Sequence, residues 1–305
     1  MSMPIEAEVL ATFGRGLLLQ LADGSLRPAR PFGRRLVIVC GDRVTCDEDA
    51  HGELLVREVL ERRSALWRTN GRGDGELIAA NLDRLCVVLA PRPEPDFFIV
   101  DRYLCAARSA SLEAAVVVNK CDLPLSDGAA GELANYTSIG YPVMTVGARD
   151  GVGVTELGAA LAGVTAALVG QSGVGKSSLI RGLAADGADA LTGSLMRDEA
   201  GRHTTTASRR YTLHGGGGLI DSPGVRDFAP SIDHLEAGAL GFVEVAKLAP
   251  GCRFADCRHM EEPKCAVRDG VDAGGISERR YESYRRLRRL SERLRDARPP
   301  GQRRR

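Results

Sequence analysis

The stretch GQSGVGKS at residues 170–177 constrains the fold of this 305-residue chain more than any other feature. It fits the pattern Gly-x-x-x-x-Gly-Lys-Ser, whose backbone N–H groups surround phosphate oxygens at the start of a helix. The apolar run TAALV precedes it and SSLIRGL follows it, so we expect a buried strand before the loop and a helix after it. A glycine-rich turn that contains Lys-Ser by chance is the alternative, and the flanking runs disfavour it. The sequence therefore predicts an α/β domain that binds a phosphate chain.

Each part of this phosphate loop has a predicted task. Lys176 is expected to reach the β- and γ-phosphates and to act in catalysis, and the Ser177 hydroxyl is expected to bind Mg²⁺. The full set of predicted contacts is Gly170, Gln171, Ser172, Gly173, Val174, Gly175, Lys176, Ser177 and Ser178.

Two downstream segments extend the predicted phosphate site. The sequence DSPG, from Asp221 to Gly224, follows the apolar run GGLI, and its Asp is expected to hold Mg²⁺ while its Gly offers an N–H to the γ-phosphate. The polar segment GRHTTTASRR at 201–210 predicts a switch loop, in which Thr204 or Thr205 contacts Mg²⁺ and the γ-phosphate. An ordinary exposed loop is the alternative for that segment. The predicted Mg²⁺ ligands are Ser177, Thr205 and Asp221.

The sequence NKCD, at the end of a valine-rich run, predicts a loop that selects guanine. The Asp122 carboxylate can accept hydrogen bonds from the two adjacent donors of guanine, and adenine offers no such pair. The stem of Lys120 can pack on the base, and Asn119 can tie this loop to the phosphate loop. Cys121 lies within the loop without a task of its own. After the next apolar run, Gly147 and Ala148 are expected to back the base, with the Ala148 N–H reaching the guanine O6.

The order of these loops along the chain is unusual. An ordinary small GTP-binding domain runs from phosphate loop to switch, Asp-x-x-Gly, Asn-Lys-x-Asp and finally the loop that backs the base. Here the two guanine loops come first, so the order is a cyclic rotation of the ordinary one. A rotation preserves every pairing of strand and loop at the carboxyl edge of the sheet, so the same site can form with the termini moved.

The flanking regions differ in texture from the central domain. Residues 5–66 form short apolar runs separated by turn signals, which predicts a small β-barrel. A glycine-rich connector follows at 68–75, and residues 241–275 are irregular and cysteine-rich before a predicted helix that begins at 277. The predicted domains are residues 1–70, 71–240 and 241–305.

Three cysteines and one histidine near the C-terminal end predict a metal site. Cys252, Cys257, His259 and Cys265 form a closed Cys₃His set, which suits one tetrahedral structural Zn²⁺ with no open position for catalysis. The segment has little apolar content of its own, so metal binding would fold it. Buried thiols beside a surface histidine are the alternative.

Charge and composition restrict the class of protein. Residues 276–305 contain 12 arginines and four acids, whereas the rest of the chain has an acidic excess, which suggests an anionic partner at this end. On charge alone, a solvated tail is an equal alternative. No apolar run of about 18 residues suggests a membrane span, and the first residues lack a secretory pattern. Eight cysteines in such a chain argue against a disulfide framework. We expect a cytoplasmic protein.

The rotated loop order, together with GQSGVGKSS, GRHTT, DSPG and the Cys/His cluster, resembles the ribosome small-subunit-dependent GTPase A family of circularly permuted GTPases. The resemblance covers nearly the whole chain. It implies a multidomain α/β protein with an oligonucleotide-binding β-barrel, a permuted P-loop GTPase domain and a zinc-binding, α-rich C-terminal domain. It also implies that the small (30S) ribosomal subunit stimulates hydrolysis of GTP to GDP during late maturation, with the barrel and the arginine-rich end on rRNA. We expect a monomer that uses hydrolysis to check or release assembly factors.

One departure from ordinary GTPases bears on the mechanism. Val225 follows Gly224, where many GTPases carry a glutamine that orients the attacking water. Slow intrinsic hydrolysis is therefore expected, and His203 is the candidate catalytic residue that replaces the glutamine when the ribosome orders its loop. A solvent-exposed switch residue is the alternative for His203.

Two other functions remain open from the sequence. One is a P-loop kinase of a small molecule, which a GTP-over-ATP preference that disappears in Asp122→Ala would exclude. The other is an rRNA-binding scaffold insensitive to nucleotide, which identical rRNA binding with GTP analogue, GDP and no nucleotide would support.

Overall fold

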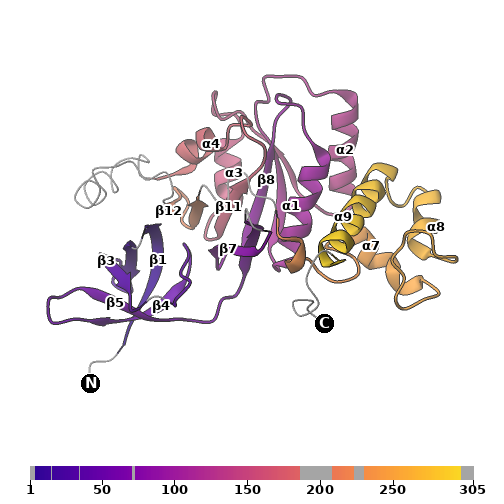
Figure 1. Cartoon of the computed structure of the whole chain (residues 1–305). Helices are drawn as coiled ribbons and strands as arrows, with labels where there is room; N and C mark the ends of the chain where they lie inside the picture. Colours follow the sequence, from indigo (N-terminus) through magenta and orange to yellow (C-terminus); the bar gives the residue numbers. More distant parts are fainter. Residues whose placement is uncertain are drawn as a thin grey trace.

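The computed structural model describes residues 4–14, 16–33, 35–70, 73–185, 208–222 and 230–296. Within these ranges the chain forms a β-rich N-terminal part, a central α/β part and a helical C-terminal part (Figure 1). This architecture confirms the predicted fold class. None of the helices in the described part of the chain combines the length and the apolar composition that crossing a membrane requires.

The N-terminal part is a closed five-stranded barrel. Its strands follow the order β1-β2-β3-β5-β4, and a second pairing between β1 and β4 closes it. Alternate residues point inward, and Val9, Leu19, Val44 and Leu54 are fully buried in its core. The strands are β1 (Ile5–Phe13), β2 (Gly16–Leu21), β3 (Leu26–Pro31), β4 (Arg43–Glu48) and β5 (Leu54–Val59).

The central part is a sheet with helices on both faces. Its strand order is β10-β9-β8-β11-β13-β12, parallel except for β12. On β8, Leu85 and Val87 pack into one core cluster with α1 and α2, whereas Cys86 and Val88 pack into the other with α3 and α4. The strands are β8 (Arg84–Leu89), β9 (Glu113–Val118), β10 (Val143–Thr145), β11 (Thr165–Val169), β12 (Ser208–Thr212) and β13 (Gly218–Asp221); the helices are α1 (Phe97–Ser109), α2 (Asp127–Ser138), α3 (Val154–Ala160) and α4 (Lys176–Leu183).

Strand β12 joins the barrel to the central sheet. It pairs with β13 on one side and with β1 on the other, where Ala11 lies opposite Arg209 and Thr12 opposite Ser208. The barrel and the central part therefore share one eleven-stranded sheet. β12 begins at Ser208, so the last three residues of the predicted switch segment 201–210 belong to a strand, and this backbone is hydrogen-bonded to the barrel.

A separate hairpin connects the two parts along the chain. Its strands are β6 (Ala65–Thr69) and β7 (Gly75–Ala80), paired antiparallel. The predicted domain boundary at residue 70 falls in the turn of this hairpin. Asn81, just after β7, donates from its side-chain amide to the Gly41 carbonyl of the barrel at 2.8 Å.

The C-terminal part packs its helices around a small core of its own. The helix predicted from residue 277 is α9, which carries an apolar stripe of Tyr284, Leu287, Leu290 and Leu294; Tyr284 and Leu287 are fully buried. Leu294 of the same stripe is 37% exposed, because it lies in the last turn of the helix, outside that core. The elements are η1 (Ile232–His234), α7 (Val243–Leu248), η2 (Ala249–Gly251), α8 (Ala266–Asp272) and α9 (Glu278–Asp296).

A buried ionic cluster fastens this helical part to the central part. The Arg280 side chain of α9 is 2% exposed and donates to Asp101 of α1 at 2.6 Å and to Glu244 of α7 at 2.9 Å. Arg279 donates to the other oxygen of Asp101 at 2.7 Å, and the Tyr136 hydroxyl also donates to Asp101. Three helices from two parts of the chain therefore share one set of buried charges.

We predict that Arg280→Ala destabilises the protein strongly, because it leaves the Asp101 and Glu244 carboxylates buried with fewer partners. Loss of one partner from a buried ion pair costs about 3–5 kcal/mol. The measurement is the thermal unfolding midpoint of the full chain by calorimetry. Arg286→Ala is the matched control, because Arg286 is exposed on the same helix and an exposed pair such as Arg286–Glu282 contributes about 1 kcal/mol or less. Equal midpoints for the two variants would contradict this account.

Candidate functional site

The predicted nucleotide loops converge on one edge of the central sheet. Parallel pairing of β8, β9, β11 and β13 places the carboxyl ends of these strands side by side. Asn119 follows β9, Gly170 follows β11, and Asp221 is the last residue of β13. The rotated order along the chain is thus compatible with an unrotated arrangement in space.

Asn119 links three of these loops through its side-chain amide. Its Nδ2 donates to the Val174 carbonyl of the phosphate loop at 2.8 Å. Its Oδ1 accepts from the Ala148 N–H of the base-backing loop at 3.0 Å. The side chain is 2% exposed, so both bonds are shielded from water. One residue therefore fixes the guanine loops relative to the phosphate loop.

Lys120 adds a second brace. It adopts a positive φ of 61°, and its Nζ donates to the carbonyls of Gly173 and Arg92, both at 2.7 Å. Arg92 lies in the loop between β8 and α1, which the sequence analysis did not include in the site. The same loop meets the phosphate loop again, where the Asp96 N–H donates to Gln171 Oε1 at 3.1 Å. The proline-rich run APRPEPD directly after a buried strand was the available signal.

The phosphate loop has the conformation that its glycines permit. Gly170, Gly173 and Gly175 all have positive φ. A Cβ at Gly170 would lie 2.0 Å from the Val88 carbonyl oxygen, and one at Gly175 would lie 2.2 Å from Asn119 Nδ2. The loop therefore depends on glycine for close backbone approach as well as for dihedral freedom. α4 begins directly after it, at Lys176.

Lys176 folds back over the phosphate loop. Its Nζ donates to the carbonyls of Gly170 at 2.6 Å and Gln171 at 2.8 Å, and the residue is 7% exposed. Ser177 is exposed at the start of α4, and Asp221 is largely buried at the end of β13. These positions suit a phosphate-binding lysine and two ligands on the Mg²⁺ side. His203, Thr204, Thr205 and Gly224 lie outside the described residues.

The guanine loop carries one exposed and one packed side chain. Asp122 is exposed, which leaves its carboxylate accessible to a base. Cys121 is half-buried, and a Cβ placed on Gly147 would lie 2.9 Å from its sulfur. Cys121 thus packs against the base-backing loop, and a side chain at position 147 would displace its sulfur.

The Cys/His cluster has the spacing of a tetrahedral metal site. The ligand atoms of Cys252, Cys257, His259 and Cys265 all lie within 4.8 Å of one another. Cys252 and Cys265 sulfurs are 3.9 Å apart, and each lies 3.4 Å from His259 Nδ1. Tetrahedral Zn–S bonds of 2.3 Å would place two sulfurs about 3.8 Å apart. The four residues therefore fit a metal ion in number, donor type and spacing.

The surroundings of the cluster also suit a bound cation. Burial lowers the pKa of His259, and the nearby Arg288 lowers it further, which favours the neutral imidazole that binds metals. Burial raises the pKa of Cys257 to about 12 without a metal, and a bound cation would favour its thiolate. Burial would raise the pKa of Glu262, but backbone N–H groups lower it to about 2, so it stays ionised and orders the loop.

Comparison with known proteins decides the family. The sequence profile described as RsgA GTPase matches residues 59–230. The chain is 42% identical over 289 residues to the small ribosomal subunit biogenesis GTPase RsgA of Azotobacter vinelandii, covering 92% of this chain and 83% of that protein. It is 40% identical to the protein of that name from Pseudomonas aeruginosa, with 92% and 84% covered. The chain belongs to the RsgA GTPase family.

Solved structures agree with membership of the RsgA family. YjeQ from Thermotoga maritima superposes with a TM-score of 0.72 at 27% identity, covering 97% of this chain and all of that one. YloQ, described as a circularly permuted GTPase, gives a TM-score of 0.70 at 20% identity, with 97% and 96% covered, and so supports the fold. The prediction of a circularly permuted GTPase is confirmed. As a GTPase, the chain is expected to use Mg²⁺ with its nucleotide.

We predict that Asn119→Ala weakens guanine-nucleotide binding about tenfold to a hundredfold. The change leaves the Val174 carbonyl and the Ala148 N–H without their shared partner, and each unsatisfied buried group costs about 1–3 kcal/mol. Calorimetric titration with GDP is the measurement. Asn135→Ala, in the second half of α2, is the control and should bind GDP normally. Unchanged affinity in Asn119→Ala would show that the loops hold their positions without this side chain.

Proposed function

We propose that this chain hydrolyses GTP to GDP and phosphate while bound to the maturing small (30S) ribosomal subunit. The observation that carries the proposal is the Asn119 amide, which couples a guanine-type loop to a phosphate loop in permuted order. The relatives named small ribosomal subunit biogenesis GTPase supply the cellular setting. In this proposal the subunit stimulates hydrolysis late in maturation, and hydrolysis serves to check or release assembly factors.

The residue roles follow from position at the sheet edge. Asp122 reads the guanine donors, and the Ala148 N–H lies in the loop that backs the base. Lys176 contacts the β- and γ-phosphates, while Ser177 and Asp221 lie on the Mg²⁺ side. We assign the remaining predicted residues, Thr204, Thr205, Gly224 and catalytic His203, to the γ-phosphate end on sequence grounds.

The flanking parts give the GTPase a means to act on RNA. We propose that the parts are residues 1–70, 71–240 and 241–305, and that the barrel and the C-terminal part contact rRNA. Support comes from β12, which contains the last residues of the predicted switch segment and is hydrogen-bonded to barrel strand β1. A change in the backbone before Ser208 therefore acts on the barrel directly. A cytoplasmic monomer is the form that this role requires.

We further propose that the Cys₃His cluster holds one structural Zn²⁺. The donor set is closed by four protein ligands, so the ion would supply folding energy rather than a reactive water. Tyr281 and Tyr284 of α9 donate to the carbonyls of His259 and Arg258 at 2.7 and 2.8 Å, so the helix holds the metal loop. Loss of the ion would remove the link that holds α8 in place, because Cys265 directly precedes this helix.

The central test is GTP turnover with and without purified small subunits. We expect slow turnover by the protein alone, because Val225 cannot orient water, and a large stimulation by the subunit. His203→Ala should lose about 100-fold or more of the stimulated rate while retaining GTP binding, as expected for loss of a group that acts on the water. His214→Ala, on the exposed turn after β12, is the control. Full stimulation of His203→Ala would remove His203 from the mechanism, and absence of stimulation in the unaltered protein would overturn the proposed coupling.

We predict that Cys257→Ser lowers zinc content from about one ion per chain to near zero, because a serine hydroxyl replaces a thiolate ligand. Elemental analysis of the purified protein is the measurement. The expected consequence is a lower unfolding midpoint for the C-terminal part. Cys105→Ser is a control for cysteine loss as such, because Cys105 is buried on α1 and is not part of the cluster. Full zinc content in Cys257→Ser would exclude this residue as a ligand.

A further inference from the structure

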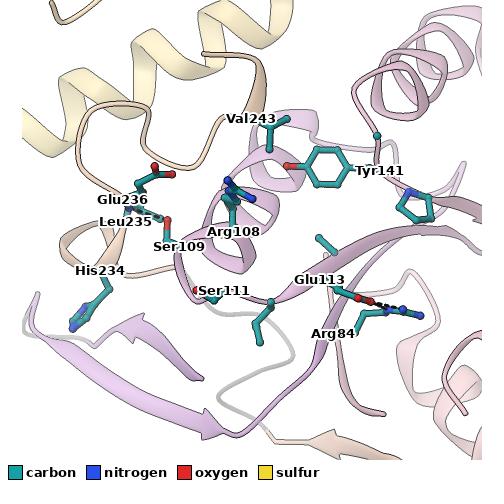
Figure 2. Close-up of a pocket in the computed structure, with 14 residues that line it drawn as sticks. Arg84, Arg108, Ser109, Ser111, Glu113, Tyr141, His234, Leu235, Glu236 and Val243 are labelled. Atoms are coloured by element: carbon teal, nitrogen blue, oxygen red, sulfur yellow. Dashed lines mark hydrogen bonds and ion pairs between the residues drawn. The ribbon is translucent and has the colours of Figure 1, made fainter. Parts of the chain in front are cut away.

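A polar cleft lies at the edge of the central sheet opposite the nucleotide loops. Arg84 and Glu113 line it at the first residues of β8 and β9, and the end of α1 forms another wall (Figure 2). The cleft has a volume of about 980 Å³. A smaller chamber of about 280 Å³ adjoins it and shares Ser109, Ser111 and His234. Neither chamber contains a residue of the GTPase site or of the metal cluster.

A stacked pair of rings lines the smaller chamber. Trp67 of β6 and His234 of η1 lie with ring centroids 4.2 Å apart and planes 5° from parallel. Backbone contacts fix the pair. The Ser231 N–H donates to the Trp67 carbonyl at 3.1 Å, and the backbones of Arg68 and Pro230 form an isolated antiparallel β-bridge. Trp67 lines the smaller chamber and is only partly buried. The held aromatic pair therefore borders the smaller chamber, and its His234 ring also borders the larger cleft.

The lining carries more positive than negative side chains, and one cation is available. Arg84 forms an ion pair with Glu113 on the rim. Arg62 and Arg63 form ion pairs with aspartates that lie outside the lining. Arg108 is exposed at the last turn of α1, and its guanidinium has no ion-pair or hydrogen-bond partner within the described ranges. Figure 2 shows it projecting between Ser109 and Tyr141. Glu113 is paired with Arg84, so Glu236 is the lining acid that would repel a bound phosphate. The lining cations are Arg62, Arg63, Arg84 and Arg108, and the lining acids are Glu113 and Glu236.

We propose that this cleft binds a single strand of RNA, with a base against the Trp67–His234 pair and a phosphate on Arg108. Aromatic stacking accepts any base, and an arginine beside it neutralises the backbone, which is the usual composition of a single-strand site. The proposal rests on the proposed function for its RNA partner and adds a contact point apart from the barrel and the arginine-rich end. Stacking and a phosphate contact do not depend on the identity of the base, so we expect little sequence preference.

The chain contains one tryptophan, so its fluorescence reports the surroundings of Trp67, which lines the smaller chamber and also a cavity beside the barrel. Variants of Arg108 and Glu236, which line only the cleft, assign a change in that fluorescence to the cleft. Titration with an eight-nucleotide single-stranded oligoribonucleotide at about 50 mM salt should quench Trp67 saturably, since a base that stacks on indole quenches it. Arg108→Ala should raise the apparent Kd about fivefold to tenfold and reduce the salt slope by about one contact. Glu236→Gln should lower the Kd, because it removes the one opposing charge. Arg295→Ala, exposed at the end of α9, is the matched control and should leave the Trp67 titration unchanged.

A labelled oligonucleotide followed by anisotropy separates the site from other RNA contacts. Trp67→Phe should preserve binding at the cleft, and Trp67→Ala should weaken it. Anisotropy that rises while Trp67 fluorescence stays constant would place the RNA elsewhere and overturn the proposal. A lower Kd for Arg108→Ala together with a higher Kd for Glu236→Gln, or quenching by a basic peptide alone, would assign the cleft to protein and overturn the proposal as well. Subunit-stimulated GTP turnover, measured in parallel, tests the proposed function separately.

Discussion

The Asn119 amide is the interaction on which the nucleotide edge depends. A circularly permuted domain supplies its guanine loops from one chain segment and its phosphate loop from another about fifty residues later, with no continuous backbone element between them. The side chain bridges this gap with one donated and one accepted hydrogen bond, both buried. Gly175 must lack a side chain for the amide to fit, so the phosphate-loop pattern and the guanine pattern are physically one requirement. Lys120 repeats the connection from the outer side of the loop.

The junction between barrel and central sheet uses the edge strand of the α/β part. β12 is the last strand of that part, pairs with β13 on one side and leaves its other edge for β1. An edge strand offers a row of unpaired backbone groups, and here a strand of the neighbouring part occupies them. The barrel is therefore attached to the strand that contains the last residues of the predicted switch segment.

Sequence reasoning recovered what short patterns encode. The glycine spacing of 170–177, the strand before it and the Asn-Lys-x-Asp loop are local, and their rotated order identified the topology. The pairing of β12 with β1 escaped prediction because it is made by backbone groups and has no side-chain signature. The arginine-rich end was counted as basic surface, yet Arg279 and Arg280 turn inward to Asp101, since charge counts do not show which face of a helix is covered. The loop from Arg92 to Asp96 was missed because, like the β12–β1 pairing, it acts through backbone groups: the Arg92 carbonyl and the Asp96 N–H. The roles of the residues at 201–207 and 224 stay predictions.

The ionic cluster around Arg280 has a mechanical consequence. Swinging the C-terminal part away from α1 would expose or strand several buried charges at once, so that part is held at a set angle to the sheet. α9 holds the loop of the Cys/His cluster through two tyrosine hydroxyls, so this loop then lies at a constant distance from the nucleotide edge. The central and C-terminal parts together form one rigid body of fixed length. A binding surface whose contact points are spaced differently can contact one end of this rigid body but not both ends at once.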